Sequence, residues 1–259
     1  QFYCYRTNGI LTADDFEKKA DGTPDENKPL VPVYKGQRIG NVKMVDQPTK
    51  MVDGKLVGDG VITEDDLVPY GNNIPDVIYG ITNRFSYKNF ELSVLIQGQI
   101  GGDVMFLGQR SLDYGSPGVN QFSHWVRCWK PDYQAVYGDR GDPTPYYLGV
   151  DMSWDGTTPN IYNRNSTYEN NSDLRIYDTT YLRIKNITLS YTLPNDLLKK
   201  SFLKKAKVYV SLDNVATFDN YPGVSPETNS YGNSTTRAGV DYSTYPMSRK
   251  YTLGVNLVF

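Results

Sequence analysis

The stretch DVIYGITNRFSYKNFELSVLIQGQI, residues 76–100, decides the fold class of this chain. Residues 77–87 and 89–100 alternate between apolar and polar side chains, and they meet at a tight turn around Lys88 and Asn89. One face of the second arm is apolar and carries Phe90, Leu92, Val94 and Ile96. Because side chains alternate across a strand with a period of two, this pattern predicts a β-hairpin with one apolar face.

Two further segments carry the same alternation. They are KVYVSLDNV, residues 207–215, and YTLGVNLVF, residues 251–259. Each strand is about 9 to 12 residues long, which is the length of a tilted transmembrane β-strand. The last strand ends on the aromatic residue Phe259. We expect this ring to be buried against lipid or among other aromatic residues.

The segment TTYLRIKNITLSYTLP, residues 179–194, alternates less regularly. Arg183 and Lys185 lie in phase with the apolar residues Ile187 and Leu189. Two explanations fit this pattern. Either a bulge near Asn186 changes which side chains face which side, or the two charges lie above the hydrocarbon layer of a membrane.

Composition narrows the class of protein. The chain has 259 residues with 22 Tyr and 23 Gly, which favours β-structure with many turns. A net charge of −2 gives no reason to expect a nucleic-acid partner. No apolar run approaches the roughly 20 residues that a membrane-spanning helix needs. Cys4 and Cys128 are expected to be unpaired, and the start at Gln1 without Met suggests a fragment of a longer chain.

The lengths of the connections between strands indicate a transmembrane barrel. Compact soluble domains seldom contain structureless loops beyond about 15 residues, whereas outer-membrane barrels combine short periplasmic turns with long extracellular loops. We therefore predict an all-β fold: an antiparallel transmembrane β-barrel segment of about five or six strands, counting residues 1–6 as the end of one. Residues 8–75, 102–177 and 218–248 are predicted to be extracellular loops, and residues 192–205 a periplasmic turn.

This topology places four aromatic residues at one boundary of the membrane. Tyr87, Phe90, Tyr191 and Phe259 all lie at strand ends that the alternation of loop lengths assigns to the periplasmic side. Aromatic residues commonly form girdles at such boundaries. The four are therefore expected to cluster there.

The chain resembles the carboxy-terminal part of a SusC/RagA-type TonB-dependent outer-membrane transporter. The resemblance rests on four segments that follow one another along the chain: QFYCYRTNGILTADDF, VGDGVITEDDLVPYGNNIPDVIYGITNRFSYKNFELSVLIQGQIGGDV, TTYLRIKNITLSYTLP and GVDYSTYPMSRKYTLGVNLVF. It implies a Bacteroidetes-type barrel in the outer membrane that takes up nutrients, importing oligosaccharides or, in some members, peptides. A SusD-like surface lipoprotein would serve as its lid.

The same resemblance implies that much of the transporter lies outside this chain. Large plugged barrels have about 22 strands, so residues 1–259 would be the C-terminal portion of the transmembrane β-barrel. The plug, most of the wall and the segment that contacts the TonB complex would belong to the missing N-terminal part. We therefore do not expect residues 1–259 to transport a ligand alone.

The motif GDGVITEDD, residues 58–66, resembles the second half of an EF-hand calcium loop. Aligned in this way, Asp59 and Asp66 would supply carboxylates, Val61 a carbonyl oxygen and Thr63 a hydroxyl oxygen. The first half of the pattern fails, as though an insertion separated Asp46 from Asp59, and Asp46 or Asp53 would have to fold back to complete a site. The alternative is a glycine turn with aspartate caps and no ion.

The sequence contains few other candidate residues for catalysis, metal binding or ligand binding. His124 is the only histidine, so a metal site with three histidines cannot be assembled, and an enzyme is not expected. Trp125, Trp129 and Trp154 are candidate ligand-binding residues in the longest loop, where they would stack on sugars; packing within the loop is the alternative.

A second class of protein stays open at this point. A secreted β-sandwich that binds carbohydrate through the tryptophans, with a calcium site, would also explain alternating strands and an acidic glycine loop. Such a protein would be soluble alone, whereas a barrel segment would require detergent.

Overall fold

The computed structural model describes residues 1–109, 122–129, 146–147, 150–151, 154–160, 171–199, 202–232, 238–242 and 244–259. Two compact units make up the chain. The first contains Gln1–Gly71 and Phe106–Ile176, and the second contains Asn72–Met105 and Tyr177–Phe259. Both are built mostly from antiparallel β-strands, as the sequence predicts. No described helix is long and apolar enough to cross a membrane.

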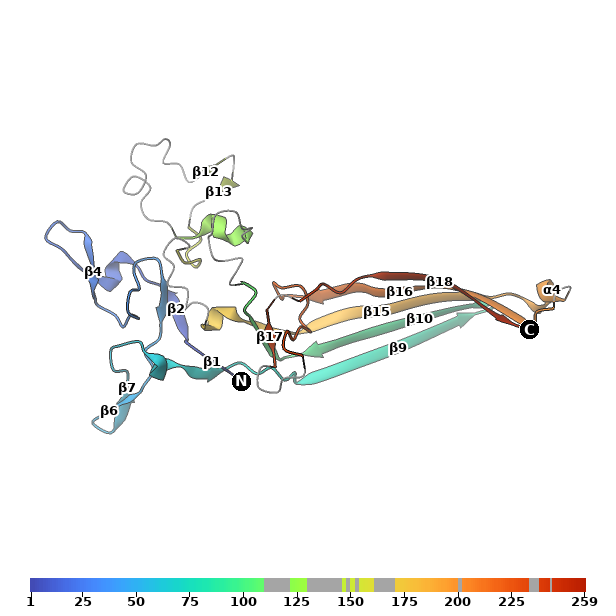
Figure 1. The fold of residues 1–259 in the computed structure, drawn as a ribbon, viewed down its shortest axis with the longest axis horizontal. Coiled ribbons are helices and arrows are strands. Elements are labelled where there is room, and N and C mark those ends of the chain that lie inside the picture. The colour runs from blue at the N-terminus through green and yellow to red at the C-terminus, as the bar shows by residue number, and fades with distance from the viewer. Residues whose placement is uncertain are drawn as a thin grey trace. The chain divides into compact units, whose positions relative to one another are not determined.

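The second unit contains a five-stranded antiparallel sheet of long strands (Figure 1). Its strands are β9 (Val77–Tyr87), β10 (Phe90–Ile100), β15 (Tyr181–Thr192), β16 (Lys205–Asp219) and β18 (Lys250–Val258). Their order across the sheet is β18-β16-β15-β10-β9, so strands adjacent in the sheet follow one another along the chain. Within the described residues the sheet is open, with β9 and β18 at its edges. All four predicted strand regions are confirmed.

Short and long connections emerge from opposite ends of this sheet. At one end a tight turn with Lys88 at a φ of 50° joins β9 to β10, and the connection with α4 (Asn195–Leu198) joins β15 to β16. The two longer connections, from β10 to β15 and from β16 to β18, leave the other end. Parts of them form a three-stranded sheet of β11 (Asp103–Phe106), β14 (Ile176–Asp178) and β17 (Val240–Asp241).

A bulge at Lys185 interrupts β15. On the β10 side, Leu95 pairs with Asn186 but Ile96 pairs with Ile184, which leaves Lys185 as the extra residue. The pairing of β15 with β16 is irregular at the same level. The bulge is therefore the correct explanation of the uneven alternation. Before the bulge the apolar side chains of β15 are at even-numbered positions (Leu182, Ile184), and after it they are at odd-numbered positions (Ile187, Leu189). The change occurs because one additional residue reverses the facing of all residues that follow.

A glycine lets one aromatic side chain lie flat across the sheet. Gly98 pairs with Tyr79, and the Tyr79 hydroxyl donates a hydrogen bond of 3.3 Å to the Tyr181 carbonyl oxygen. A Cβ atom at Gly98 would collide with the Tyr79 ring and with that carbonyl. Gly98 thus provides the space that the ring of its cross-strand partner occupies.

The first unit consists of short strand pairs. These are β1 (Phe2–Cys4) with β8 (Val68–Tyr70), β2 (Thr7–Ile10) with β5 (Val42–Met44), β3 (Phe16–Lys18) with β4 (Pro24–Pro29), β6 (Lys50–Val52) with β7 (Lys55–Val57), and β12 (Tyr146–Tyr147) with β13 (Val150–Asp151). A small core of Tyr5, Met44 and Ile62 packs against Tyr34 and Leu67. Cys4 and Cys128 are both buried, and neither forms a disulfide, as expected.

Residues 1–6 do not form a sixth strand of the long sheet. Phe2 and Cys4 are buried within the first unit, and β1 pairs with β8 instead. The long sheet therefore has five strands, the lower of the two numbers expected. The sequence of this segment alternates like a membrane strand, but its apolar side chains are used by the local core.

Two glycines of the hairpin give a matched test of this packing. Gly98→Ala should destabilise the purified transporter by about 1 to 3 kcal/mol, because the new methyl group overlaps the Tyr79 ring. Gly80 in β9 has open space where its Cβ would lie, so Gly80→Ala should be neutral or slightly stabilising. Thermal unfolding in detergent measures both, and equal effects would contradict the role of Gly98.

Candidate functional surfaces and loop sites

One face of the five-stranded sheet is apolar and exposed. Leu92 lies level with Phe85 and Leu189, and Leu189 lies level with Val210, which pairs with Leu253. Apolar side chains thus extend across the whole width of the sheet. Val208, Val210, Leu253, Val255 and Leu257 are between 36% and 74% exposed. Soluble monomers rarely expose an apolar patch of this extent, so the face is a site of contact with lipid or protein.

The opposite face of the same sheet is polar. Ser93, Thr188, Ser211 and Thr252 pair across four neighbouring strands. Nearby, the Asn186 side-chain amide donates hydrogen bonds of 2.8 Å to the Ser211 hydroxyl and 2.7 Å to an Asp213 carboxylate oxygen. This face is suited to water rather than to lipid, since its side chains satisfy one another and also offer groups for hydration.

Arg183 belongs to the polar face, which the sequence alone did not reveal. Its side chain is 1% exposed, and its Nε donates a hydrogen bond of 2.8 Å to the Thr217 hydroxyl. The guanidinium also pairs with the carboxylate of Glu227, which accepts a hydrogen bond from the Tyr181 hydroxyl. A buried charge needs such a partner. Arg183 therefore fastens part of the connection between β16 and β18 to the sheet.

Aromatic residues gather at the end of the sheet with the short connections. Phe90 pairs with both Tyr87 and Tyr191, and its ring centroid lies 4.7 Å from that of Tyr191. Phe259 stacks on Phe202, with ring centroids 5.6 Å apart and an interplanar angle of 7°. The expected grouping at one end is confirmed, and Phe202 from the β15–β16 connection adds to it.

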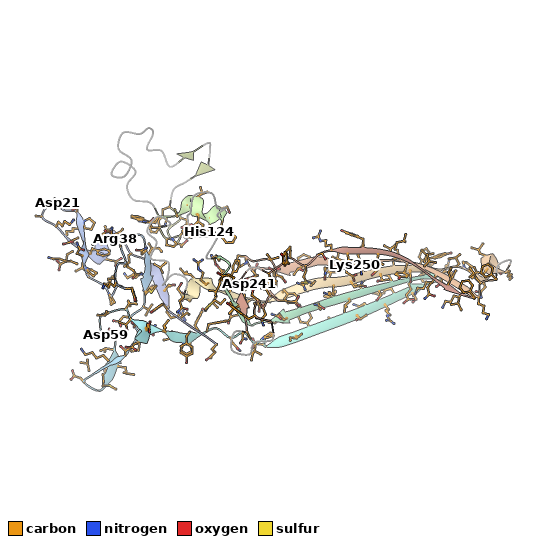
Figure 2. All side chains as sticks on the ribbon, in the orientation of Figure 1. Asp21, Arg38, Asp59, His124, Asp241 and Lys250 are labelled. Carbon is orange, nitrogen blue, oxygen red and sulfur yellow. The ribbon has the colours of Figure 1, made fainter. Side chains whose placement is uncertain are left out.

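The calcium-like loop folds around an inserted hairpin in the first unit. Strands β6 and β7 form that hairpin, with Asp53 and Gly54 at its turn, both at positive φ. The hairpin brings Asp46 back to the loop, where its carboxylate accepts hydrogen bonds from the backbone N–H groups of Asp59 (3.3 Å) and Gly60 (2.9 Å). Asp46 and Asp53 were the two aspartates expected to fold back toward the loop. Asp46 does so, whereas Asp53 lies at the tip of the hairpin. Asp59 is labelled in Figure 2.

Three of the predicted ligands of this loop, Asp59, Thr63 and Asp66, accept hydrogen bonds. Asp66 is buried, and its two carboxylate oxygens accept backbone hydrogen bonds of 2.7 Å from Gln47 and from Thr63. The Thr63 side chain caps the short helix Glu64–Asp66, and one carboxylate oxygen of Asp59 accepts the N–H of Val61 at 2.9 Å. Aspartates that accept backbone N–H groups in this way stabilise a turn without an ion.

The arrangement of acidic side chains in this loop does not form a ready-made metal site. Across the described ranges, no three His, Cys, Asp or Glu side chains lie close enough together to hold one. In this conformation the loop therefore does not present a set of converging carboxylates, and its hydrogen bonds alone explain its shape. Calcium binding by Asp59, Val61, Thr63 and Asp66 stays a prediction.

All three tryptophans make contacts within the first unit. Trp125 is buried in the short helix Ser123–Arg127, and the ring of Trp129 fills the space where a Cβ of Gly40 would lie. Trp154 is 38% exposed and donates an Nε1 hydrogen bond of 2.9 Å to the Thr158 carbonyl. Of the three, Trp154 offers the largest exposed aromatic surface to a ligand.

The turn beside Trp154 is held by Asp155. Its carboxylate accepts hydrogen bonds from the backbone and side chains of Thr157 and Thr158. Burial would raise the pKa of Asp155, but these hydrogen bonds outweigh it and lower the pKa to about 2. The turn is therefore a stable anionic feature at neutral pH.

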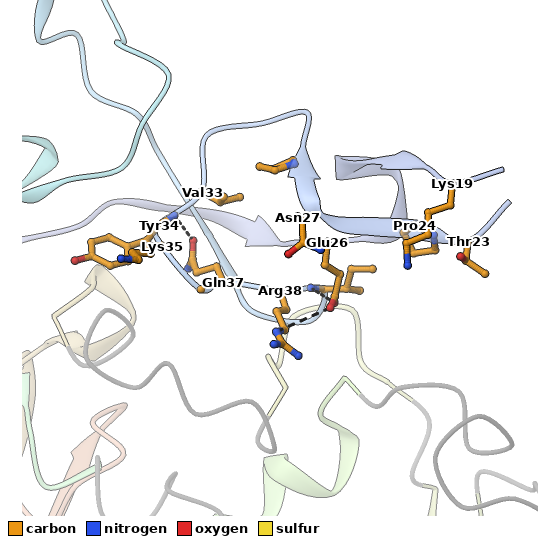
Figure 3. Close-up of a pocket in the computed structure, with 13 residues that line it drawn as sticks. Lys19, Thr23, Pro24, Glu26, Asn27, Val33, Tyr34, Lys35, Gln37 and Arg38 are labelled. Atoms are coloured by element: carbon orange, nitrogen blue, oxygen red, sulfur yellow. Dashed lines mark hydrogen bonds and ion pairs between the residues drawn. The ribbon is translucent and has the colours of Figure 1, made fainter. Parts of the chain in front are cut away.

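A polar cavity of about 770 Å³ lies in the first unit, and no sequence pattern predicted it. Figure 3 shows the residues that line it. Lys19, Lys35 and Arg38 lie among its lining residues. Glu26 accepts the backbone N–H of Ile39 at 3.2 Å and lies 4.0 Å from the Arg38 guanidinium. The lining contains no histidine or cysteine. His124 stacks instead on Phe122, with ring centroids 5.6 Å apart.

Comparison with known proteins shows the relatives of this chain. It is 32% identical over 209 residues to TonB-dependent receptor P3 of Formosa agariphila, an alignment that covers 79% of this chain and 18% of the receptor. It is 24% identical over 222 residues to TonB-dependent receptor SusC of Bacteroides thetaiotaomicron, covering 84% of this chain and 19% of the receptor. No protein-family model matches the chain.

Solved structures show the same fold. The RagAB peptide importer in its open-open state superposes with a TM-score of 0.63 at 19% identity, covering 100% of this chain and 22% of that chain. A second structure, of the RagAB peptide transporter, gives the same TM-score at 18% identity. This chain thus spans about a fifth of the length of the proteins that it matches.

A sheet with one apolar and one polar face, together with these relatives, defines the chain as part of a TonB-dependent receptor. Within that class it belongs to the SusC/RagA type, as the sequence resemblance implies. Homology to such receptors implies an outer-membrane location, and the relatives named here are TonB-dependent receptors rather than enzymes. The relatives give no support to a secreted β-sandwich.

Proposed function

We propose that residues 1–259 form the C-terminal portion of the wall of a plugged β-barrel that imports oligosaccharides or peptides. The observation that carries this proposal is the single sheet with an exposed apolar face and a polar face, since a barrel wall separates lipid from a wet interior. Edge strands β9 and β18 would continue into the rest of the barrel, because open sheet edges do not persist in hydrocarbon.

The remaining parts of the transporter follow from the same proposal. Residues 8–75, 102–177 and 218–248 would form extracellular loops and contact a SusD-like lipoprotein. The plug and the contact with the TonB complex would lie in the N-terminal part, outside this chain. The proposal includes both oligosaccharides and peptides as substrate classes. RagAB, which shares the fold, is a peptide importer.

The facing of the sheet gives the main test. Val94→Arg should destabilise the transporter by roughly 2 to 4 kcal/mol, because Val94 lies on the apolar face and its replacement would put a charge in lipid near the midplane. Ser93→Arg should be much milder, because Ser93 lies on the polar face. Folded protein recovered from outer membranes and its unfolding in detergent measure the effect. Equal damage from both variants would indicate two buried faces and contradict a barrel wall.

Strand direction gives a second test. Leu197 lies in the short β15–β16 connection and Tyr245 in the long β16–β18 connection, and both are exposed. On intact cells, Tyr245→Cys should react with a membrane-impermeant maleimide, whereas Leu197→Cys should react only after permeabilisation. Cys4 and Cys128 of this chain are buried, and the transporter without the new cysteine measures the background. The reverse pattern would invert the proposed topology.

Calcium binding at the Asp59 loop is a separate proposal. An extracellular site with hard oxygen ligands would have a dissociation constant of about 0.1 to 1 mM. Calorimetry at millimolar calcium should then show binding that disappears in an Asp59→Ala, Asp66→Ala double variant and weakens in Asp59→Asn, which keeps the hydrogen bond from Val61. Asp53→Ala at the hairpin tip is the control. No binding by the unmodified transporter would leave the hydrogen bonds as the full explanation of the loop.

A further inference from the structure

Exposed apolar side chains lie in the connection between β15 and β16 and at the end of β18, beyond the strands of the long sheet. Leu197 in α4 is 68% exposed, Phe202 is 80% exposed and Phe259 is 64% exposed. Figure 1 shows α4 and the C-terminal end of β18 at the same end of the sheet. The stacking of Phe202 on Phe259 joins the connection to that strand end. We call these three residues the apolar turn residues.

The same connection and the start of β16 are rich in lysine. Residues 195–207 contain five lysines and one acidic residue, Asp196. The Asp196 carboxylate pairs with Lys199 at 2.6 Å, and Lys207 pairs with Glu91 of β10 at 3.2 Å. Because a single aspartate cannot balance five lysines, the segment has a net positive charge.

Two of these lysines lie at the border of the apolar face. Lys204 and Lys205 are exposed, and within the part of the chain that the structure describes neither forms an ion pair. The Lys204 N–H donates to the Val258 carbonyl at 2.7 Å, which fixes the backbone at this point. Lys204 precedes β16 in phase with Ala206 and Val208, one step beyond the apolar residues of that strand. A lysine at such a border can lay its stem along apolar surface and hold its ammonium group in the polar layer.

The combination of exposed apolar side chains and lysines matches an anionic lipid. Acyl chains cover apolar surface, and a lipid phosphate pairs with ammonium groups. The apolar turn residues also continue the exposed apolar face of the sheet, since Val255 and Leu257 of β18 lie on that face directly before Phe259. A zwitterionic headgroup fits less well, because its own ammonium group would lie beside the lysines.

We propose that Lys204, Lys205 and the apolar turn residues bind an anionic phospholipid at the periplasmic boundary of the membrane. The inference rests on the proposed function, because it takes the apolar face of the sheet to be covered by lipid. The phosphate pairs with the two ammonium groups, and the acyl chains lie against Phe202 and the adjoining apolar face. A lipid held in this way fixes the depth of this end of the sheet in the membrane.

Native mass spectrometry of the complete transporter in detergent, titrated with phosphatidylglycerol, tests the inference. A Lys204→Gln, Lys205→Gln double variant should weaken phosphatidylglycerol binding about tenfold or more, since each basic residue near an anionic lipid contributes about fivefold in affinity. A Lys204→Arg, Lys205→Arg variant keeps the charge and should bind normally. Phe202→Ala should weaken binding several-fold, because it removes apolar surface that the acyl chains cover.

The matched control is a Lys50→Gln, Lys55→Gln double variant of the β6–β7 hairpin. Two exposed lysines accompany the exposed Met51 and Leu56 there, but in the first unit. This variant should bind phosphatidylglycerol as the unmodified transporter does. Phosphatidylethanolamine with the same acyl chains should bind the unmodified transporter about tenfold more weakly than phosphatidylglycerol.

The outcomes separate this inference from the function on which it rests. Equal affinity for the two phospholipids, or undiminished phosphatidylglycerol binding by the folded Lys204→Gln, Lys205→Gln variant, would overturn the lipid site and leave the barrel wall standing. A transporter that stays folded and soluble without detergent would overturn the barrel wall and this inference together. Circular dichroism establishes that each variant is folded.

Discussion

The alternation of side chains across the five-stranded sheet is the constraint on which the rest of the structure depends. Successive side chains of a strand face opposite sides, so a single irregular residue reverses the facing of everything beyond it. The bulge at Lys185 is such a residue. It allows Leu182 and Ile184 to continue the apolar face that Ile187 and Leu189 begin, and it moves Arg183 to the polar side.

The position of Arg183 on the polar face also determines a contact with the connection between β16 and β18. With Arg183 on the polar face, its guanidinium reaches Glu227, and Tyr181 reaches the same carboxylate. Part of the connection between β16 and β18 is therefore held against the sheet by an ion pair between the buried Arg183 and the partly exposed Glu227. The same register thus determines both the two faces of the sheet and this contact with the connection.

The sequence predicted the long strands well because a period of two is a local signal, visible in the hairpin of residues 76–100 and in the last strand. It left the Lys185 region open, because a bulge is defined by pairing with β10 and β16 and not by one strand alone. Residues 1–6 alternate like a membrane strand, yet their apolar side chains enter a local core. The return of Asp46 to the Asp59 loop and an aspartate-capped turn were both among the expected possibilities. Which N–H groups Asp46 binds depends on how the β6–β7 hairpin folds back, and the sequence does not specify that.

Oxygen accessibility of nitroxide labels along β15 tests the account most directly. Labels at Ile187 and Leu189 should collide with oxygen dissolved in lipid, and labels at Thr188 and Ser190 should not. Beyond Lys185 the parity should invert, so that labels at Leu182 and Ile184 are the accessible ones. This inversion is what a barrel wall with a bulge at Lys185 requires. Accessibility that keeps one parity along the whole strand, or shows no alternation, would contradict it.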